Sequence, residues 1–536
     1  MHTSLVLAGF SLANLCLAEP GFLSLKTYRN TEAHAQALRK RSSFPVTLGN
    51  YPYAGGGIYF VNATVGSPAQ EVQLQIDTGS SDVWMFGVHS CDSSTSPCLG
   101  GAFDISASQT ATILDEGGFQ IQYVTAGSGV TGDYIGDSFT IGGTTIKNLT
   151  MGVSTKAVSV DTGIMGIGFD AEEAIVGQEV QAGNSNPQPY PNFIDELKLQ
   201  GLIGTKSYSL YLDDLETSTG SIIFGGYDKA KFQGDLGILT IQPDSQSGTY
   251  SSFGVILNSM GVTDSTGSTV ISSSSMPNVV ILDSGTAYTV LPPDIFNELV
   301  AYFGALKDKD YGLIIQCDLN GMAGTLDYQF AGPTGPIVSV PFSELAIPIV
   351  DPETGESLTD NQNNPVCHLG LDQTTSADEP LLWGDTFLRS AYVVYDLENL
   401  QIGIAQTIFN VTSSDVQLIT AGSGQSLPGN IASVMTTIVQ TKTEGLNGGP
   451  TKTVISSAPT DIQSTFGGGK GASALSGYKT TYTNRATNIP SASSTTTAKK
   501  SGAAPLNTLA SGFWKGMLIQ GLVVAAASFI GAKLIL

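Results

Sequence analysis

Short runs of apolar residues, many of them alternating with polar residues, recur through the middle of the chain. The most regular runs cover 58–65, 72–76, 119–124, 221–224, 279–282 and 391–395. Gly, Asn, Asp and Pro interrupt the pattern about every ten residues, a spacing typical of strands and turns. Helical periodicity is scarce, and its best examples cover 192–199 and 292–303. The pattern predicts a mainly β protein with a few short helices, folded between about Phe44 and Asn410.

One stretch of sequence occurs twice. Residues 71–80 read EVQLQIDTGS and residues 277–286 read PNVVILDSGT, so each β run ends in Asp, a hydroxyl residue, Gly and a second hydroxyl residue. The two aspartates, Asp77 and Asp283, are 206 positions apart, about half of the predicted folded region. The simplest interpretation is two similar lobes, each presenting one carboxylate at a turn after a strand.

The residues around these aspartates suit a catalytic pair. Glycine permits a sharp turn and close backbone approach, and hydroxyl groups can orient a carboxylate; the residues concerned are Thr78, Gly79, Ser80, Ser284, Gly285 and Thr286. Two carboxyl groups that face each other cannot both be ionised, so the pair holds one proton. The ionised member can take a proton from water while the protonated member polarises a substrate carbonyl. This chemistry needs no metal, no cofactor and no nucleophilic Ser or Cys.

A third Asp-Thr-Gly begins at Asp161, but Ile164 stands where the other copies have a hydroxyl residue. The tripeptide alone carries little information. We therefore expect Asp161 to be structural, at the start of an apolar strand.

The N-terminal end has the features of an exported precursor. An apolar run from Leu5 to Ala18, followed by Glu19, predicts a signal peptide over 1–18, with a buried N-terminal helix as the alternative. Residues 19–41 are basic and end in Arg39-Lys40-Arg41. They predict a propeptide that a dibasic-directed processing protease cuts after Arg41.

The C-terminal end predicts a surface anchor. Residues 411–500 are rich in Ser, Thr and Gly without helical or strand periodicity, and we expect a disordered, O-glycosylated stalk. Small residues at 501–504, a spacer and the apolar tail 517–536 together indicate a glycolipid (GPI) anchor signal, with Ser501 and Gly502 as candidate attachment sites. An ordinary transmembrane helix is the alternative. Residues 42–410 form the predicted folded domain, with lobes at about 44–225 and 226–410.

Composition and cysteine spacing agree with export. The 46 acidic residues outnumber the 23 basic ones, which argues against nucleic-acid binding and suits work at low pH. Apart from Cys16 in the signal peptide, the cysteines suggest the disulfides Cys91–Cys98 and Cys317–Cys367. Sequons at Asn62, Asn148 and Asn410 predict N-glycosylation. We expect a monomer on the extracellular face of the plasma membrane or in the cell wall.

Three motifs together resemble pepsin-like aspartic endopeptidases. Residues 77–84 read DTGSSDVW, residues 281–286 read ILDSGT and residues 382–389 read LWGDTFLR. The resemblance covers about Phe44 to Gln406. It implies two β lobes with a deep cleft for polypeptide substrates, and Asp77 and Asp283 as the catalytic residues.

The same resemblance implies a β-hairpin flap that closes over the cleft. Phe119 to Tyr123 and the glycine-rich residues 127–132 resemble this hairpin, so Tyr123 is the expected flap residue. Trp84 would support Tyr123 from below, and Ser80 and Thr286 would hydrogen-bond the carboxylates. Each of these residues could instead be ordinary core packing.

The propeptide, stalk and anchor signal, with residues 190–203, resemble the fungal surface-anchored, yapsin-like branch. Its members favour cleavage beside Lys or Arg, so we expect the same preference here by analogy. A basic propeptide along an acidic cleft would hold the enzyme inactive near neutral pH, with activation below about pH 5. The competing interpretation is a wall adhesin or display protein on an inactive protease scaffold, although both aspartates and their hydroxyl neighbours are present.

Overall fold

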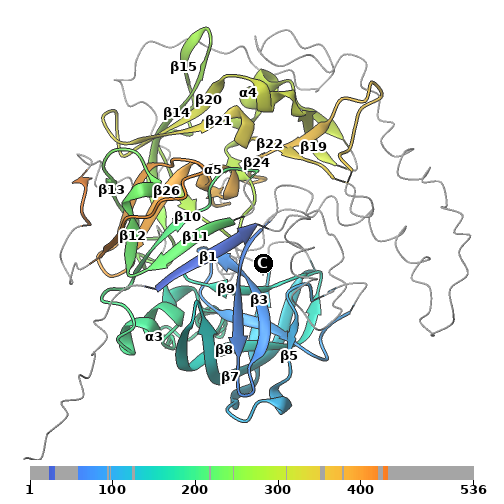
Figure 1. Cartoon of the computed structure of the whole chain (residues 1–536), viewed down its shortest axis with the longest axis vertical. Coiled ribbons are helices and arrows are strands. Elements are labelled where there is room, and N and C mark those ends of the chain that lie inside the picture. Colours follow the sequence, from blue (N-terminus) through green and yellow to red (C-terminus); the bar gives the residue numbers. More distant parts are fainter. Residues whose placement is uncertain are drawn as a thin grey trace, which may run out of the picture.

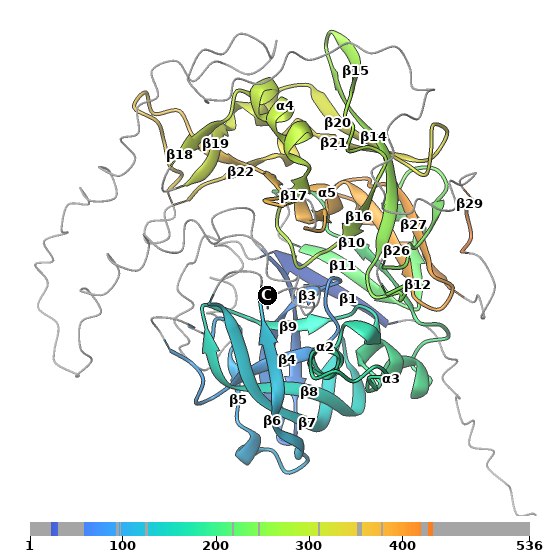
Figure 2. The same ribbon diagram turned by 180° about the vertical axis from the view of Figure 1, so that it is seen from behind.

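The computed structural model describes residues 23–29 and 58–431, apart from short gaps at 93–95, 97, 124–126, 217–218, 245–246, 309–310, 351–355, 377–378 and 420–426. Two β lobes lie one above the other, with the N-terminal half of the chain in one lobe and most of the C-terminal half in the other (Figures 1 and 2). The predicted mainly β, two-lobed fold is confirmed. Within the described residues, no helix is both long enough and apolar enough to cross a membrane.

The N-terminal lobe is built from eight strands of one large sheet. They are β2 (Tyr59–Val65), β3 (Gln70–Asp77), β4 (Val83–Gly87), β5 (Ala102–Phe103), β6 (Thr112–Gln122), β7 (Gly129–Ile141), β8 (Thr144–Val158) and β9 (Gly163–Gly166). The longest pairing joins β7 and β8, which run antiparallel from Gly129 opposite Val158 to Ile141 opposite Thr144. Two helices accompany these strands, α2 (Ala174–Gln181) and α3 (Phe193–Leu199).

The same sheet continues from the N-terminal lobe into strands from distant parts of the chain. These strands are β1 (Leu23–Arg29), β10 (Ser207–Tyr211), β11 (Thr219–Phe224), β13 (Gly237–Thr240), β26 (Ala391–Asp396), β27 (Gln401–Gln406) and β29 (Asn430–Ile431). Beside them lies a two-stranded sheet of β12 (Gly226–Asp228) and β28 (Val416–Leu418). Because β10 pairs with β26, backbone hydrogen bonds tie the two halves of the chain together.

The C-terminal lobe contains an eight-stranded and a four-stranded sheet. The first consists of β14 (Gly254–Asp264), β15 (Gly267–Ile271), β16 (Asn278–Leu282), β17 (Thr289–Leu291), β20 (Gly324–Phe330), β21 (Ile337–Pro341), β24 (Leu371–Gln373) and β25 (Leu382–Trp383). The second consists of β18 (Leu306–Asp308), β19 (Gly312–Gln316), β22 (Ala346–Pro348) and β23 (Val366–Leu369). The helices here are α4 (Pro293–Phe303) and α5 (Asp385–Leu388).

The hydrophobic core is continuous between the lobes. Tyr208 of β10 stacks on Tyr395 of β26 with ring centroids 4.9 Å apart, and Phe253 packs edge-on against Tyr395 at 4.7 Å. All three side chains are fully buried. Large aromatic side chains contribute strongly to burial energy, so this cluster stabilises the junction between the lobes.

Both disulfides suggested by the sequence are present. Cys91 and Cys98 close a short loop after β4, with their Cα atoms 5.5 Å apart. Cys317 and Cys367 join the residue after β19 to β23, with a Cα separation of 5.1 Å. Each bridge therefore lies within a single lobe and stiffens that lobe alone.

Strand pairing extends beyond both predicted limits of the folded region. Residues 23–29, in the predicted propeptide, form β1 between β11 and β2. This part of the propeptide therefore lies within the sheet, and not along the cleft as expected. Past Asn410, β28 pairs with β12, β29 pairs with β13, and Ile419 and Leu427 are buried. Short strands form here despite few apolar residues, because the edges of β12 and β13 supply backbone hydrogen-bond partners.

Candidate active site

Asp77 is the last residue of β3, and the chain turns away immediately after it. Strand β9 runs parallel to β3 and places Gly166 beside Asp77. Two further hydrogen bonds fix the turn: Ile167 N–H donates to Asp77 O at 2.9 Å, and Gly168 N–H donates to Ser80 O at 2.8 Å. The first motif therefore lies on a rigid, buried support.

Asp283 has a matching environment in the other lobe. It follows β16, and β25 runs parallel to β16 with Leu282 beside Trp383. Asp283 N–H donates to Trp383 O at 3.0 Å, and Asp385 N–H donates to Thr286 O at 2.9 Å. The late motif at 382–389 thus supports the second loop, as β9 supports the first.

The two loops are bonded directly to each other. Thr78 Oγ1 donates to Leu282 O at 2.9 Å and accepts from Ser284 N–H at 2.9 Å. In the mirrored arrangement, Ser284 Oγ donates to Ile76 O at 3.0 Å and accepts from Thr78 N–H at 3.2 Å. Both hydroxyl residues are buried, so these bonds fix the distance between the loops.

Each carboxylate is oriented by its own loop. Asp77 accepts a hydrogen bond from Gly79 N–H at 2.8 Å and another from the Ser80 hydroxyl. Asp283 accepts from Gly285 N–H at 2.8 Å and from Thr286 Oγ1 at 2.6 Å. Each carboxyl group is therefore held through both of its oxygens by donors of its own loop.

The two carboxyl groups lie close together. Each shifts the pKa of the other, and a Cβ atom placed on Gly79 would be only 2.6 Å from Asp283 Oδ1. Glycine is therefore required at position 79 for this approach. Burial and the adjacent Asp283 raise the pKa of Asp77 well above its usual value, and burial raises the pKa of Asp283. The arrangement retains one proton between the two groups.

Tyr123 lies at the end of the β6–β7 hairpin, above the first loop. Its N–H donates to Ser128 O at 3.2 Å, and the hairpin residues 124–126 lie outside the described residues. Burial, followed by the charge of Asp77, raises the pKa of Tyr123, whereas the Trp84 indole lowers it. Tyr123 and Trp84 belong to the same buried hydrophobic cluster.

The remaining predicted residues are placed as follows. Asp161 precedes β9, its carbonyl accepts from Leu99 N–H at 2.8 Å, and burial raises its pKa to about 6. The sequon residues Asn62, Asn148 and Asn410 are exposed. Arg41, Ser501 and Gly502 lie outside the described residues. Among those that are described, no group of three or more His, Cys, Asp or Glu side chains is arranged to hold a metal ion.

Two residues at the site were not singled out by sequence reasoning. Gln75 is buried in β3 and its Nε2 donates to Gly285 O at 3.1 Å, which adds another bond between the lobes. Asp82 is a buried carboxylate five positions after Asp77. Neither residue had a clear sequence signal: the alternation of residues 71–76 places Gln75 on the polar side of the strand, and Asp82 stands out only as part of the 77–84 motif.

Comparisons with known proteins agree with this geometry. Residues 58–407 match the family model described as eukaryotic aspartyl protease. The chain belongs to this pepsin-like family, and it is an aspartic-type endopeptidase.

Among curated proteins, the chain is similar to the "Probable aspartic-type endopeptidase opsB" of Aspergillus oryzae, at 34% identity over 76% of this chain and 80% of the relative. The protein of the same name in Aspergillus fumigatus is 36% identical over 68% of this chain and 72% of the relative. "Secreted aspartic protease 8" of Candida albicans is 34% identical over 67% and 78%, respectively.

Proposed function

We propose that Asp77 and Asp283 are the catalytic pair of this endopeptidase and that they cleave polypeptides at acidic pH with one shared proton. The observation that supports the proposal is the close approach of two buried carboxyl groups with matched donors, one from each lobe. Because β3 and β16 end at the same seam, neither lobe alone contains a complete site.

The proposed reaction starts from a water molecule held between the two groups. The ionised carboxylate removes a proton from water while the protonated carboxyl donates its proton to the substrate carbonyl oxygen. The resulting hydroxide forms a C–O bond and gives a tetrahedral diol. The diol then returns a proton through the pair to the amide nitrogen, the C–N bond breaks, and the shared proton is restored.

A simple assay tests this proposal. Denatured protein should be cleaved at about pH 4 by the wild-type enzyme in a pepstatin-sensitive reaction, because the pair must keep one proton. Asp77→Asn keeps the shape of the side chain but cannot hold a negative charge. Cleavage by this variant at the wild-type rate would contradict the assignment.

The proposal includes export and attachment at the cell surface. The signal-like residues 1–18, two disulfides and three exposed sequon residues support passage through the secretory pathway. The small residues 501–504 and the apolar tail support a glycolipid anchor of the yapsin-like type. Phosphatidylinositol-specific phospholipase C should release full-length protein from cells, and a chain ending at 500 should be secreted without treatment.

A zymogen form is also part of the proposal. The described part of the predicted propeptide, β1, pairs with β11 from Leu23 opposite Phe224 to Tyr28 opposite Thr219. Cleavage after Arg41 would therefore leave a segment still hydrogen-bonded within the sheet that joins the lobes. A precursor with Ala at 39–41 should be inactive at pH 7, and full activity at that pH would contradict the zymogen model.

Preference for Lys or Arg beside the cleaved bond rests on the yapsin-like resemblance and agrees with the net charge of -23. A peptide-library digest should show enrichment of Lys and Arg at cleavage sites. An unchanged background frequency of both residues would remove this part of the proposal.

A further inference from the structure

Asp82 is a buried acid next to the catalytic loop that the proposed reaction does not use. Its side chain is 3% exposed, and it accepts three hydrogen bonds from neutral donors. Oδ1 accepts from Tyr134 Oη at 2.9 Å and from Tyr190 Oη at 2.7 Å, and Oδ2 accepts from Ala174 N–H at 2.7 Å. Such a fully bonded buried carboxylate holds its partners in fixed positions.

The three donors come from three different elements. Tyr134 belongs to β7, which forms the base of the flap hairpin; Ala174 begins α2; and Tyr190 lies between α2 and α3. Asp82 itself is attached to the catalytic loop, because its carbonyl accepts from Gly166 N–H at 3.0 Å and Gly166 pairs with Asp77. One side chain therefore joins the first catalytic loop to the flap.

A column of aromatic rings carries this constraint from Tyr190 toward Trp84. Successive ring centroids are 5.6 Å apart for Tyr190 and Tyr134, 5.3 Å for Tyr134 and Phe119, and 6.2 Å for Phe119 and Trp84. Phe119 is in β6, the other strand of the flap, and Trp84 lies beside Tyr123. Fixing the Tyr134 ring therefore fixes the packing beneath the flap tyrosine.

A second buried acid completes the cluster. Glu173 is fully buried; its Oε2 accepts from Tyr190 N–H at 2.9 Å, and its Oε1 has no hydrogen-bond partner. Burial and the charge of Asp82, with smaller contributions from Asp170 and Asp195, raise the pKa of Glu173 to about 10. Glu173 therefore stays protonated, which avoids repulsion of a second negative charge near Asp82.

We propose that Asp82 is the positioning residue of the flap: through Tyr134 and Tyr190, its carboxylate holds the base of the β6–β7 hairpin against the first catalytic loop, so that Tyr123 closes over the substrate in one orientation. The inference rests on the proposed roles of Asp77 and Tyr123. It assigns Asp82 no part in proton transfer to the substrate.

The test is a steady-state comparison of Asp82→Asn with wild type. Asn replaces one acceptor oxygen with an NH₂ donor, so either the bond from Ala174 N–H is lost or the bonds from both tyrosine hydroxyls must reverse direction. A loosened flap weakens substrate and transition state equally, and KM should rise about tenfold while kcat stays within about twofold. Pepstatin affinity should fall by a similar factor.

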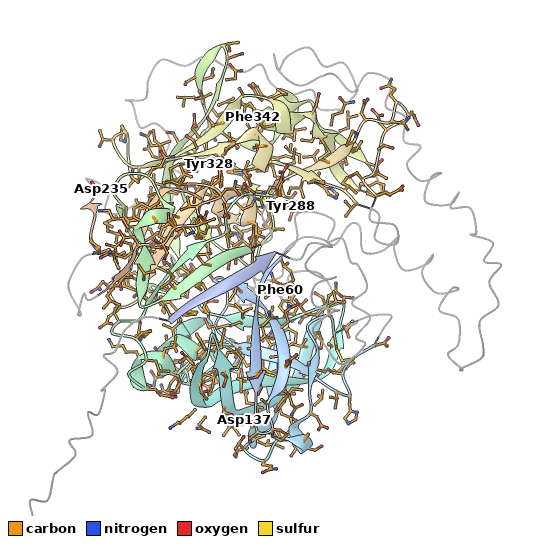
Figure 3. The ribbon with its side chains drawn as sticks, in the orientation of Figure 1. Phe60, Asp137, Asp235, Tyr288, Tyr328 and Phe342 are labelled. Atoms are coloured by element: carbon orange, nitrogen blue, oxygen red, sulfur yellow. A yellow bond between two sulfur atoms is a disulfide. The ribbon has the colours of Figure 1, made fainter. Side chains whose placement is uncertain are left out.

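Asp137→Asn is the matched control. Asp137 is also a buried acid of β7, 1% exposed, and accepts from Ser108 Oγ at 2.7 Å and Thr110 Oγ1 at 2.6 Å. It lies at the end of the lobe far from the C-terminal lobe (Figure 3). This variant should lose thermal stability but keep the wild-type KM.

Two results would overturn the proposal: a KM for Asp82→Asn equal to that of Asp137→Asn, or a fall in kcat with KM unchanged.

Tyr190→Phe removes one donor and keeps the ring, and it gives a second test if Asp82→Asn does not fold. It should raise KM about fivefold, and a wild-type KM would count against the proposal. An active Asp77→Asn would instead reject the catalytic assignment, whatever the result at Asp82.

Discussion

At the level of single residues, Thr78 and Ser284 determine how the two carboxylates meet. Their hydroxyl groups each donate to a carbonyl of the opposite loop and each accept from an N–H of that loop. Buried polar groups cost free energy when they lose a partner, so the two loops cannot separate without leaving several groups unpaired. The same bonds therefore serve both stability and catalysis.

Thr78→Val tests this role because it keeps the side-chain shape and removes both hydroxyl bonds. Leu282 O and Ser284 N–H would then be buried without partners, and the free energy of unfolding should fall by about 2–4 kcal/mol. Urea unfolding measures the change. Thr145→Val, at an exposed position of β8, is the control and should stay within about 0.5 kcal/mol of wild type.

The repeated Asp-hydroxyl-Gly-hydroxyl sequence was sufficient to predict that these two loops come together. It could not predict their supports, because Gly166 and Trp383 are distant in sequence and reach Asp77 and Leu282 only through parallel strand pairing. Asp82 stood in the quoted motif, but its partners Tyr134 and Tyr190 become visible only when three elements pack together.

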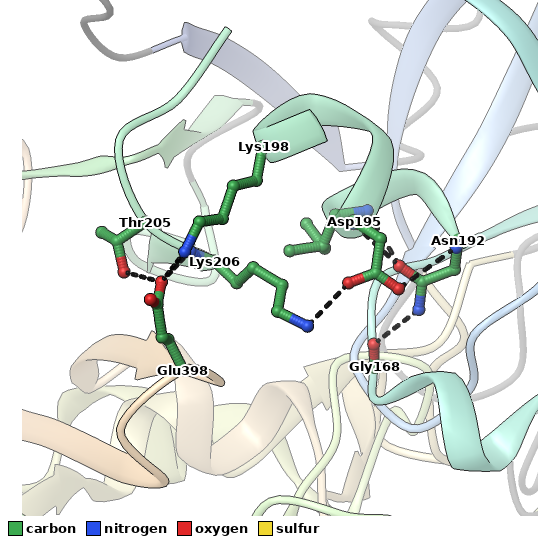
Figure 4. Close-up of polar contacts among 8 residues, drawn as sticks. Gly168, Asn192, Asp195, Lys198, Thr205, Lys206 and Glu398 are labelled. Carbon is green, nitrogen blue, oxygen red and sulfur yellow. Dashed lines mark hydrogen bonds and ion pairs between the residues drawn. The ribbon is translucent and has the colours of Figure 1, made fainter. Parts of the chain in front are cut away.

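At the level of elements, α3 connects the catalytic loop to the rest of the N-terminal lobe. Asn192 caps this helix, accepting from Ile194 N–H at 3.0 Å and Asp195 N–H at 3.2 Å. Its Nδ2 also donates to Gly168 O at 3.1 Å (Figure 4). Gly168 in turn bonds Ser80, so the cap and the catalytic loop share one residue.

Two substitutions separate these roles of Asn192. Asn192→Ala removes both the cap and the Gly168 bond, and should lower the free energy of unfolding by about 1–2 kcal/mol with a loss of activity. Asn192→Ser keeps a capping oxygen and removes the bond to Gly168, at a cost of about 1 kcal/mol. Equal stability of the two variants would show that the cap contributes nothing.

Helix α3 and helix α4 were both predicted, since each has a clear apolar face and a recognisable start. The described strands β2, β3, β11, β16 and β26 also match the predicted runs closely. Helix α2 was missed, because it is short, contains Gly177 and buries only Val176. The full length of β6 was missed because residues 112–117 are exposed and alternate poorly.

For the whole molecule, the balance of buried and paired acids determines how stability depends on pH. Burial raises the pKa of Asp161 and of Asp372 to about 6 each. Because each group holds its proton more tightly in the folded protein, it stabilises the fold most below about pH 3.9, the pKa of Asp in the unfolded chain. This stabilisation is lost as pH rises through about 6, the pKa in the folded protein. The pKa of Glu173 is raised to about 10, so its stabilising contribution is also lost as pH rises, over the range up to about pH 10.

Glu398 acts in the opposite direction. It accepts from Lys198 Nζ at 2.5 Å and Thr205 Oγ1 at 3.0 Å, linking α3 and the chain before β10 to the turn after β26 (Figure 4). Burial opposes its ionisation, but these donors outweigh burial and lower the pKa of Glu398. Its contribution is present above the unfolded value of about 4.3 and is lost as pH falls further.

We therefore expect maximal thermal stability in the acid range and a falling melting temperature between about pH 4 and 7. Asp161→Asn removes one of the responsible groups and should reduce this dependence, as measured by calorimetry across the interval. Glu71→Gln, at an exposed position of β3, should leave the slope unchanged. A melting temperature that rises steadily toward pH 7 would contradict this account of the buried acids.

The central claim is that one acid from each lobe meets the other and that the two share a proton. The most direct measurement is the pH profile of kcat/KM for wild type, Asp77→Asn and Asp283→Asn, with circular dichroism to verify that each variant is folded. The wild-type profile should be bell-shaped in the acid range, and each substitution should reduce the maximum by at least about a thousandfold. A folded variant of either kind that retained more than about a tenth of wild-type activity would contradict the claim.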